Sequence, residues 1–330
     1  MSHYLRGSLV VSELREDNFQ LDNSPVPLVL TDFMVITWNV FNFVEGLKHL
    51  YSPELLDKVT KAVWAIKLNR GPDMLPSHDY RVVVVSDKRF PDSKTYWRGV
   101  EVLRDERIEA CWEEYCEKKG WDIENIPTGY KGNRRDKDDN FHRVHEIGWE
   151  YATKYFPCFR QEGYEADDFA GLLYREVKET SDKLLRDRQK LMLTIDRDWS
   201  GLVDESMNLW WANTRYPGPR EKIQERLAGE DQVIFHTQYK LGFEINTPFE
   251  IFAAKAEAGE LGDNLPPGAP IEYIDLTQPH KKYDLRNFDV YEPFVEAVCG
   301  TESNVNRDHY DQSIKALQQI GVPVPSQWLG

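Results

Sequence analysis

Three short apolar runs in this chain each end at an aspartate. The runs are residues 26–32 (VPLVLTD), 81–87 (RVVVVSD) and 191–196 (LMLTID), which end at Asp32, Asp87 and Asp196. Runs that are apolar throughout, rather than alternating, are typical of strands buried on both faces of a parallel sheet. Because ligands of open α/β sheets bind at the carboxyl ends of the strands, we expect three strands to direct an acid toward one edge.

Segments with helical patterns lie between these runs. Residues 52–68, with Pro53 at the first helical position, carry apolar side chains on one face, and 141–155 and 166–180 also indicate helices. Residues 232–236 (QVIFH) predict a fourth strand. Alternating strands and helices favour an α/β fold with a central, mostly parallel sheet flanked by helices.

Two segments depart from this alternation. Residues 99–140 are rich in charge and weak in strand character, which predicts a helical or loop insertion over the sheet edge. Residues 258–283 are rich in glycine and proline and are expected to form a loop. We expect residues 1–270 to form one α/β domain and residues 271–330 to pack on it as a C-terminal segment.

The overall charge restricts the class of protein. The chain of 330 residues has 56 acidic and 41 basic residues and a net charge of −15. This argues against a simple electrostatic nucleic-acid binder, since such domains are usually basic, but not against an enzyme whose metal ions neutralise clustered acids. The four cysteines show no metal-ligand spacing. With neither a signal peptide nor an apolar run of about 20 residues, we expect a cytoplasmic protein that does not bind a membrane.

Two acidic clusters contain the candidate metal-binding residues. Residues 163–168 (GYEADD) contain Glu165, Asp167 and Asp168, and Asp196 and Asp198 begin a second cluster 28 residues after Asp168. Two like charges about 4 Å apart repel by roughly 4 kcal/mol near a protein surface. If these clusters meet, we expect them to hold a divalent metal.

The order of the motifs resembles that of a known family. In chain order they are Asp32, Asp87, residues 97–98 (WR), 130–134 (YKGNR), 163–168 (GYEADD), 196–198 (DRD) and 259–264 (GELGDN). This set resembles the 5′-nuclease (flap endonuclease) family, which includes bacterial 5′–3′ exonucleases and phage RNase H enzymes. The resemblance covers roughly residues 28–268, and the specific matches concentrate between 130 and 200.

The resemblance implies a PIN-like 5′-nuclease fold with a charged helical arch over residues 99–140. It implies a hydrolase that uses two Mg²⁺ or Mn²⁺ ions, acts on DNA or an RNA–DNA hybrid with a 5′ end, flap or RNA primer, and serves DNA replication. The metal ligands it implies are Asp32, Asp87, Glu165, Asp167, Asp168, Asp196, Asp198, Glu260 and Asp263. Lys131 and Arg134 would be catalytic and, with Arg98, would contact the substrate phosphate.

The sequence also departs from the family pattern. Between Arg98 and Tyr130 lie 31 residues, where relatives have only a handful. Glu260 stands where an aspartate is usual, and Pro266-Pro267-Gly268 follows where relatives have a duplex-binding helix-hairpin-helix. Two other functions stay open: a non-catalytic nucleic-acid-binding replication protein that retains the fold, and a PIN-type ribonuclease.

Ordinary structural roles stay open for the same residues. Asp32 and Asp87 suit strand-end turns, and the acids from Glu165 to Asp168 suit the first turn of a helix. The cations near Lys131 and Arg134 alternate with acids and also suit a mixed-charge surface. A calcium loop opening at Asp196 is disfavoured, because its twelfth position is Met207 rather than glutamate.

Overall fold

The computed structural model describes most of the chain. The described residues are 26–70, 79–88, 101–126, 137–194, 196, 198–205, 207–211, 226–260, 264–268 and 284–329, without the side chains of 101–108, 208–211, 226–228 and 327. Its helices are α1 (Phe33–Glu45), α2 (Pro53–Asn69), α3 (Glu101–Lys119), α4 (Asp139–Tyr155), α5 (Ala166–Glu179), α6 (Lys183–Asp187), α7 (Glu230–Leu241), α8 (Glu250–Ala258), α10 (Tyr291–Cys299) and α11 (Arg307–Ile320). Short 3₁₀ helices include η2 (Ile123–Asn125), η3 (Asp198–Leu202), η6 (Leu285–Asn287) and η7 (Ser326–Trp328).

The sheet is mostly parallel. Its strands are β1 (Leu28–Asp32), β2 (Arg81–Val85), β3 (Cys158–Phe159), β4 (Lys190–Thr194), β5 (Met207–Trp211) and β6 (Arg226–Ala228), in the order β3-β2-β1-β4-β5-β6. All neighbouring pairs are parallel except β5 and β6. The predicted α/β class, with a central and mostly parallel sheet flanked by helices, is confirmed.

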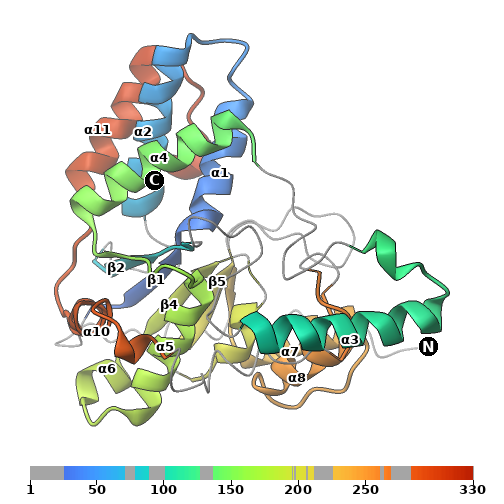
Figure 1. Ribbon diagram of the computed structural model, residues 1–330. Helices are drawn as coiled ribbons and strands as arrows, with labels where there is room; N and C mark the ends of the chain where they lie inside the picture. The colour runs from blue at the N-terminus through green and yellow to red at the C-terminus, as the bar shows by residue number, and fades with distance from the viewer. Residues whose placement is uncertain are drawn as a thin grey trace, which may run out of the picture.

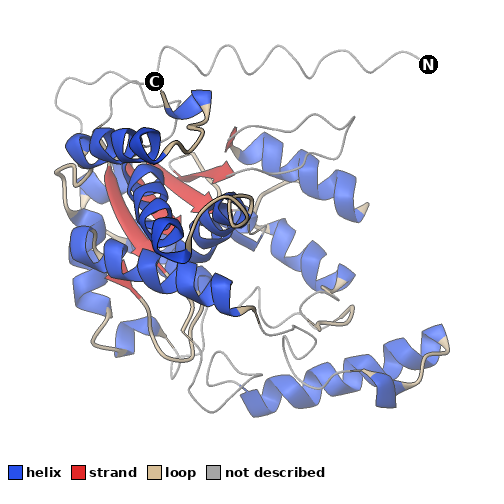
Figure 2. Ribbon diagram, turned by 90° about the horizontal axis from the view of Figure 1, so that it is seen from above, coloured by secondary structure: helices blue, strands red, loops and turns tan. Residues whose placement is uncertain are grey.

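Helices cover both faces of the sheet, as the apolar strands require (Figure 1). Along β1, Leu28 and Leu30 join one hydrophobic core with residues of α5, α8 and α10, and Val29 joins a second core with residues of α1, α2, α4 and α11. Figure 2 shows the strands seen from above among the surrounding helices. Burying one such side chain fully stabilises the fold by about 1.5–3 kcal/mol, so both faces contribute to its stability.

The strand predicted at residues 232–236 is wrong, because these residues lie within helix α7. Gly229 is the residue before the helix, and its N–H donates to the Gln232 side chain at 3.0 Å. Val233, His236 and Thr237 are buried at helical spacing. A short apolar run is ambiguous on its own, and here the capping residues on both sides decide for helix.

The charged insertion contains one long helix, α3, followed by η2. Trp112 and Cys116 of α3 pack with Leu265, and Trp112 Nε1 donates to the Asn264 carbonyl oxygen at 3.3 Å. The helix therefore contacts the loop that follows α8.

The C-terminal helices belong to the two cores described above. Phe294 and Val298 of α10 lie in the core of α5, while Ile314 and Leu317 of α11 lie in the core of α2. The domain boundary near residue 270 stays a prediction, since it falls outside the described residues. In the described part of the chain, no helix combines the length and apolarity needed to cross a membrane.

Candidate metal centre

Asp32 links the sheet to the first helix. It is the last residue of β1 and the N-cap of α1, where its Oδ1 accepts a hydrogen bond from the Met34 N–H at 2.9 Å. Its other oxygen, Oδ2, accepts from the Thr194 hydroxyl at the end of β4, at 3.0 Å. The carboxyl group is thereby fixed between neighbouring strands at the carboxyl edge of the sheet.

Burial and neighbouring acids raise the pKa of Asp32 to about 8. Burial is the largest cause, followed by the negative charges of Asp87 and then Asp196, while the hydrogen bonds from Thr194 and Met34 act in the opposite direction. The three strand-end acids predicted to face one edge therefore interact electrostatically. A carboxyl group in this position gains from any cation that compensates its charge.

Two of the predicted acids cap the start of α5. Asp87 lies two residues beyond β2, and its Oδ1 accepts from the Ala166 N–H at 2.9 Å. Asp168 Oδ2 accepts from the Glu165 N–H at 2.8 Å, and the Glu165 side chain is also buried. Carboxylates are favourable at a helix N-terminus, so these acids have a local structural role at the same edge.

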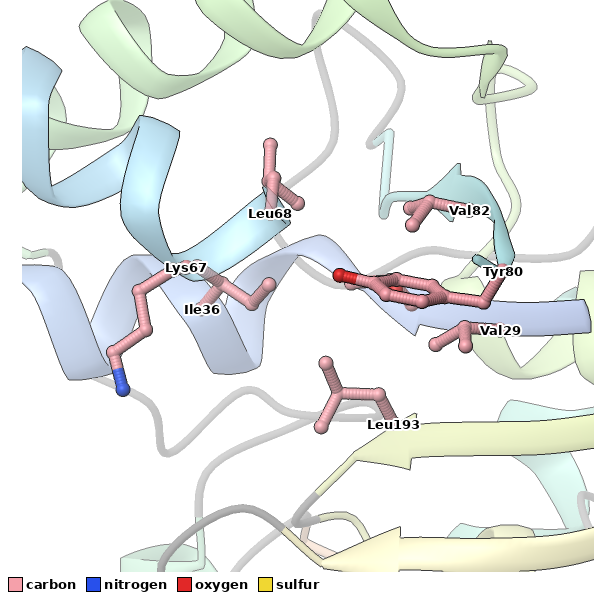
Figure 3. Close-up of a pocket in the computed structure, with 8 residues that line it drawn as sticks. Val29, Ile36, Lys67, Leu68, Tyr80, Val82 and Leu193 are labelled. Carbon is pink, nitrogen blue, oxygen red and sulfur yellow. The ribbon is translucent and has the colours of Figure 1, made fainter. Parts of the chain in front are cut away.

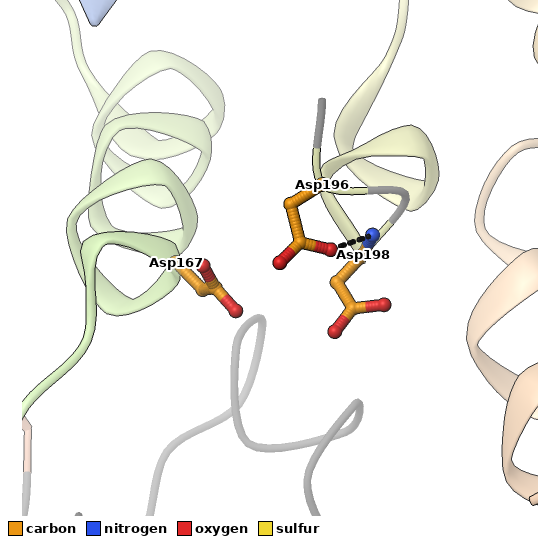
Figure 4. A group of neighbouring side chains, drawn as sticks. All are labelled: Asp167, Asp196 and Asp198. Carbon is orange, nitrogen blue, oxygen red and sulfur yellow. Dashed lines mark hydrogen bonds between the residues drawn. The ribbon is translucent and has the colours of Figure 1, made fainter. Parts of the chain in front are cut away.

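Asp167, Asp196 and Asp198 form the tightest acidic group (Figure 4). One carboxylate oxygen from each lies within 4.8 Å of the others. Asp167 comes from the first turn of α5, whereas Asp196 and Asp198 come from the segment after β4. The two clusters that the sequence separates by about thirty residues therefore meet in space.

Neighbouring polar groups position the backbone at Asp196 and orient the carboxylates of Asp196 and Asp167. The Thr194 hydroxyl accepts from the Asp196 N–H at 2.9 Å, and Asp196 Oδ1 accepts from the Asp198 N–H at 3.0 Å (Figure 4). The indole N–H of Trp199, which is fully buried, donates to Asp167 Oδ1 at 2.9 Å. These hydrogen bonds hold the oxygens in place without neutralising their charge.

A lysine completes the group. Lys255 of α8 forms ion pairs with Asp198 and with Glu260, the latter at 3.2 Å. The side chains of Lys255 and Asp198 are buried, whereas Glu260 is about one-third exposed, at 34%. Glu260 thus lies beside the cluster through a shared cation.

Six of the nine predicted metal ligands lie close enough at this edge to interact with one another or with a shared neighbour. Asp32, Asp87, Asp167, Asp196, Asp198 and Glu260 interact as described, and Glu165 and Asp168 lie at the start of α5. Asp263 and the predicted phosphate contacts Arg98, Lys131 and Arg134 lie outside the described residues. Their roles, and the ligand assignment itself, stay predictions.

Sequence reasoning did not assign roles to Thr194, Trp199 and Lys255. Thr194 and Trp199 are close in sequence to Asp196 and Asp198, and polar neighbours of a candidate ligand are natural candidates for orienting it. Lys255 offers no comparable signal, because its contact with Asp198 depends on the packing of α8.

A separate small cavity lies between α1, α2 and the sheet (Figure 3). It is lined by Val29, Thr31, Ile36, Lys67, Leu68, Tyr80, Val82 and Leu193. The ammonium of Lys67 lies 5.5 Å from the centre of the Trp328 ring. The lining is largely aliphatic, so this cavity lacks the convergent polar groups of a catalytic site.

The acidic group suits a hard divalent cation. Its donors are carboxylate oxygens, which Mg²⁺ and Mn²⁺ prefer, whereas zinc and copper favour sets that include histidine or cysteine. Burial first, and then the negative charges of Asp87 and Asp196, raise the pKa of Asp32, and a divalent cation at this edge would offset the contribution of those two charges. The residues present therefore fit the metal that the sequence predicts.

Comparison with known proteins gives distant structural alignments only. No known protein family matches the sequence, and no curated protein matches it. A zinc-bound bacteriophage T5 5′-exonuclease aligns at 15% identity and a TM-score of 0.40, covering 89% of this chain and 93% of that chain. A bacteriophage T5 flap endonuclease variant, in a pseudo-enzyme–product complex with DNA and metal ions, aligns at 16% identity and a TM-score of 0.42, covering 89% and 98%. Alignments at this distance do not assign the chain to a family.

Proposed function

We propose that this protein is a divalent-metal-dependent 5′-nuclease that hydrolyses phosphodiester bonds at DNA 5′ ends, flaps or RNA primers. The observation that carries the proposal is the meeting of Asp167, Asp196 and Asp198 at the carboxyl edge of the sheet, next to Asp32. Acids from three separate parts of the chain are costly to hold together without a cation. Their oxygen-only donor set and the order of the sequence motifs both favour phosphodiester chemistry.

The chain's own residues would hold and orient the cation. Mg²⁺ or Mn²⁺ would activate a water and stabilise the developing charge on the phosphate and the leaving oxygen. Asp167, Asp196 and Asp198 are the proposed ligands; Trp199 orients the carboxylate of Asp167, and the Asp198 N–H orients that of Asp196. The proposed roles of Asp87 and Asp168 combine capping of α5 with shaping the negative potential of the site.

Phosphate binding requires positive charge near this acidic edge. We propose that Arg98, Lys131 and Arg134 supply it, as the sequence resemblance implies. With a net charge of −15, the protein would otherwise repel a polyanion. We expect substrate binding to weaken strongly as salt rises, because contacts between basic side chains and phosphates are salt-dependent.

Cleavage of a labelled 5′-flap duplex tests the proposal. The purified chain is incubated with EDTA, Mg²⁺ or Mn²⁺, and we expect cleavage only with metal. Asp196→Asn should reduce the rate by at least about 100-fold, since bound metal contributes several kcal/mol to such reactions. Asp187→Asn is the matched control, because Asp187 is half-exposed on α6 and pairs with Arg186. Absence of cleavage under every metal condition would contradict the proposal.

Parallel substrates separate the proposal from its alternatives. Equal lengths of single-stranded RNA, single-stranded DNA and 5′-flap DNA distinguish a ribonuclease from a flap nuclease. Metal-dependent binding of the flap without cleavage would indicate a non-catalytic nucleic-acid-binding protein. Cleavage of RNA alone would favour the PIN-type ribonuclease.

A further inference from the structure

The side chain of Lys255 lies where an additional cation of the acidic site would be expected. Its ammonium contacts Asp198, one of the three clustered acids, and Glu260, which comes from the loop after α8. Buried charges in proteins are normally paired, and this lysine is paired with two carboxylates at once. It therefore serves as an internal counter-ion for one side of the site.

The backbone fixes this position from two sides. A Cβ atom on Gly201 of η3 would lie 2.4 Å from the Phe252 ring, so α8 packs tightly against the segment that carries Asp198. On the other side, Gly259 has a φ of 71° and lies next to Glu260, whose backbone pairs with Leu265. Lys255, Asp198 and Glu260 thus come together through packing of their helices and loop.

The two sides of the acidic site differ in the described contacts of their carboxylates. Asp167 and Asp196 lie on the side of α5 and β4, whereas Asp198 and Glu260 share the ammonium of Lys255. The divalent cation proposed above would draw mainly on Asp167 and Asp196, whose carboxylates accept hydrogen bonds, because Asp198 already contacts an ammonium. A second cation bound by Asp198 and Glu260 would have to displace the ammonium or accept its repulsion.

We propose that Lys255 takes the place of a second divalent cation, so that this site binds one ion tightly and a second only weakly. The inference deepens the proposed nuclease function and rests on it, because it concerns the same acidic site. It differs from the site of two ions that the sequence resemblance implies, because only one of them would bind tightly. The number of tightly bound ions is therefore set by a residue that is itself no metal ligand.

Calorimetric titration of the EDTA-stripped full chain with Mn²⁺ tests the inference. For the wild type we expect one tight ion and a second that binds at least about 10-fold more weakly. Lys255→Met should convert this isotherm to two tight ions, and Lys255→Arg, which keeps the charge, should retain one. Lys178→Gln is the matched control, since Lys178 pairs with Asp204 outside the acidic site, and it should leave the isotherm unchanged.

The dependence of Tm on metal distinguishes a lysine that replaces a cation from a lysine with only a packing role. Lys255→Met should lower Tm in EDTA, because Asp198 loses its counter-ion. In saturating Mn²⁺ the Tm of the variant should return to that of the wild type. A lysine with only a packing role would lower Tm equally in both conditions. If Lys255→Met does not fold without metal, the isotherms of the wild type and of Lys255→Arg decide whether one ion or two bind tightly.

The outcomes separate the two proposals. The role of Lys255 would be overturned if the wild type bound two ions equally tightly, or if a folded Lys255→Met variant gave an unchanged isotherm. Either result would leave the proposal of a metal centre unaffected. No Mn²⁺ binding by the wild type would overturn the metal centre, and with it the nuclease proposal.

Discussion

The oxygens of the acidic group are held by neighbouring donors within the fold. The Thr194 hydroxyl donates to the Asp32 carboxylate and accepts from the Asp196 backbone N–H, and Trp199 donates to the Asp167 carboxylate. Groups that orient a metal ligand commonly affect metal affinity by 10-fold to 100-fold, roughly, when they are removed. At the scale of single residues, these two side chains are therefore where small changes should have measurable effects on metal binding.

Replacing Trp199 by phenylalanine removes the hydrogen bond to Asp167 and keeps most of the ring. We expect Trp199→Phe to weaken Mn²⁺ binding by about 10-fold, measured by calorimetry. Trp64→Phe is the control, because Trp64 is equally buried and donates to the Val144 carbonyl oxygen. Both variants should lose stability, but only the first should lose metal affinity, and equal affinities would show that Trp199 has no orienting role.

The raised pKa of Asp32 predicts an unusual dependence of stability on pH. The metal-free native state keeps the proton up to pH about 8, whereas the unfolded chain releases it near its ordinary value of 3.8. Because the native state binds more protons in this window, the free energy of unfolding contributed by Asp32 falls as pH rises from about 4 to 8.

Asp32→Asn should remove this contribution. In EDTA we expect the variant to exceed the wild-type Tm by about 5 °C at pH 8 and to match it more closely near pH 4, measured by circular dichroism. Saturating Mn²⁺ should reverse the order at pH 8, because only the aspartate carries charge for the ion. A wild-type Tm in EDTA that rises through this window as steeply as that of the variant would contradict the prediction.

Elements differ in how far their sequence determines them. The buried strands β1, β2 and β4 could be predicted because each contains an uninterrupted run of at least three apolar residues and ends near an acid. Residues 232–236 could not, because five residues fit a strand and a helix equally, and α7 is decided by residues outside that run. The two-residue strand β3 is too short to leave any pattern.

The contact between η3 and α8 positions Lys255 and can be tested at Gly201. A methyl group there would overlap the Phe252 ring, so Gly201→Ala should destabilise the fold by about 1–3 kcal/mol. Phe252→Leu combined with Gly201→Ala should recover part of the loss, since the smaller side chain leaves room. Urea unfolding measures both, with Gly46→Ala as a control at a glycine whose φ is −63°. Additive losses in the double variant would contradict this account of the packing.

On the scale of the whole molecule, hydrogen bonds from one arginine connect the segment before β1 with the end of α10. Arg188 is buried and donates to the carbonyl oxygens of Val26, Val298 and Gly300 at 2.5, 2.9 and 2.7 Å. Burial lowers the pKa of its guanidinium to about 10, which still leaves it charged at neutral pH. The segment before β1 and the end of α10 are thus connected at the edge of the sheet opposite the acids.

Arg188→Met should show how much this connection contributes to the free energy of unfolding. Removing the guanidinium leaves carbonyl oxygens without their donor, at about 1–3 kcal/mol for each buried unsatisfied group. We expect a loss of about 3 kcal/mol in urea unfolding. Arg186→Met, at an exposed residue that pairs with Asp187, should change stability little, and an equally small effect at Arg188 would contradict the prediction.

The arrangement of the whole molecule could be predicted only in part. The sequence indicates which strands carry acids, but the order β3-β2-β1-β4-β5-β6 depends on pairings between segments far apart in the chain. Helix α8 likewise brings Lys255 to Asp198 through tertiary packing that no local pattern records. The acidic part of the site was therefore predictable and its internal counter-ion was not.

The central place of β1, between β2 and β4, has a consequence for synthesis of the chain. Asp32 and Asp87 leave the ribosome long before Asp196 and Asp198, which arrive only with the strand on the other side of β1. A nascent chain that ends before residue 190 lacks Asp196 and Asp198 and cannot form the acidic group. Under the proposed function, nuclease activity would therefore begin only after β4 has paired with β1.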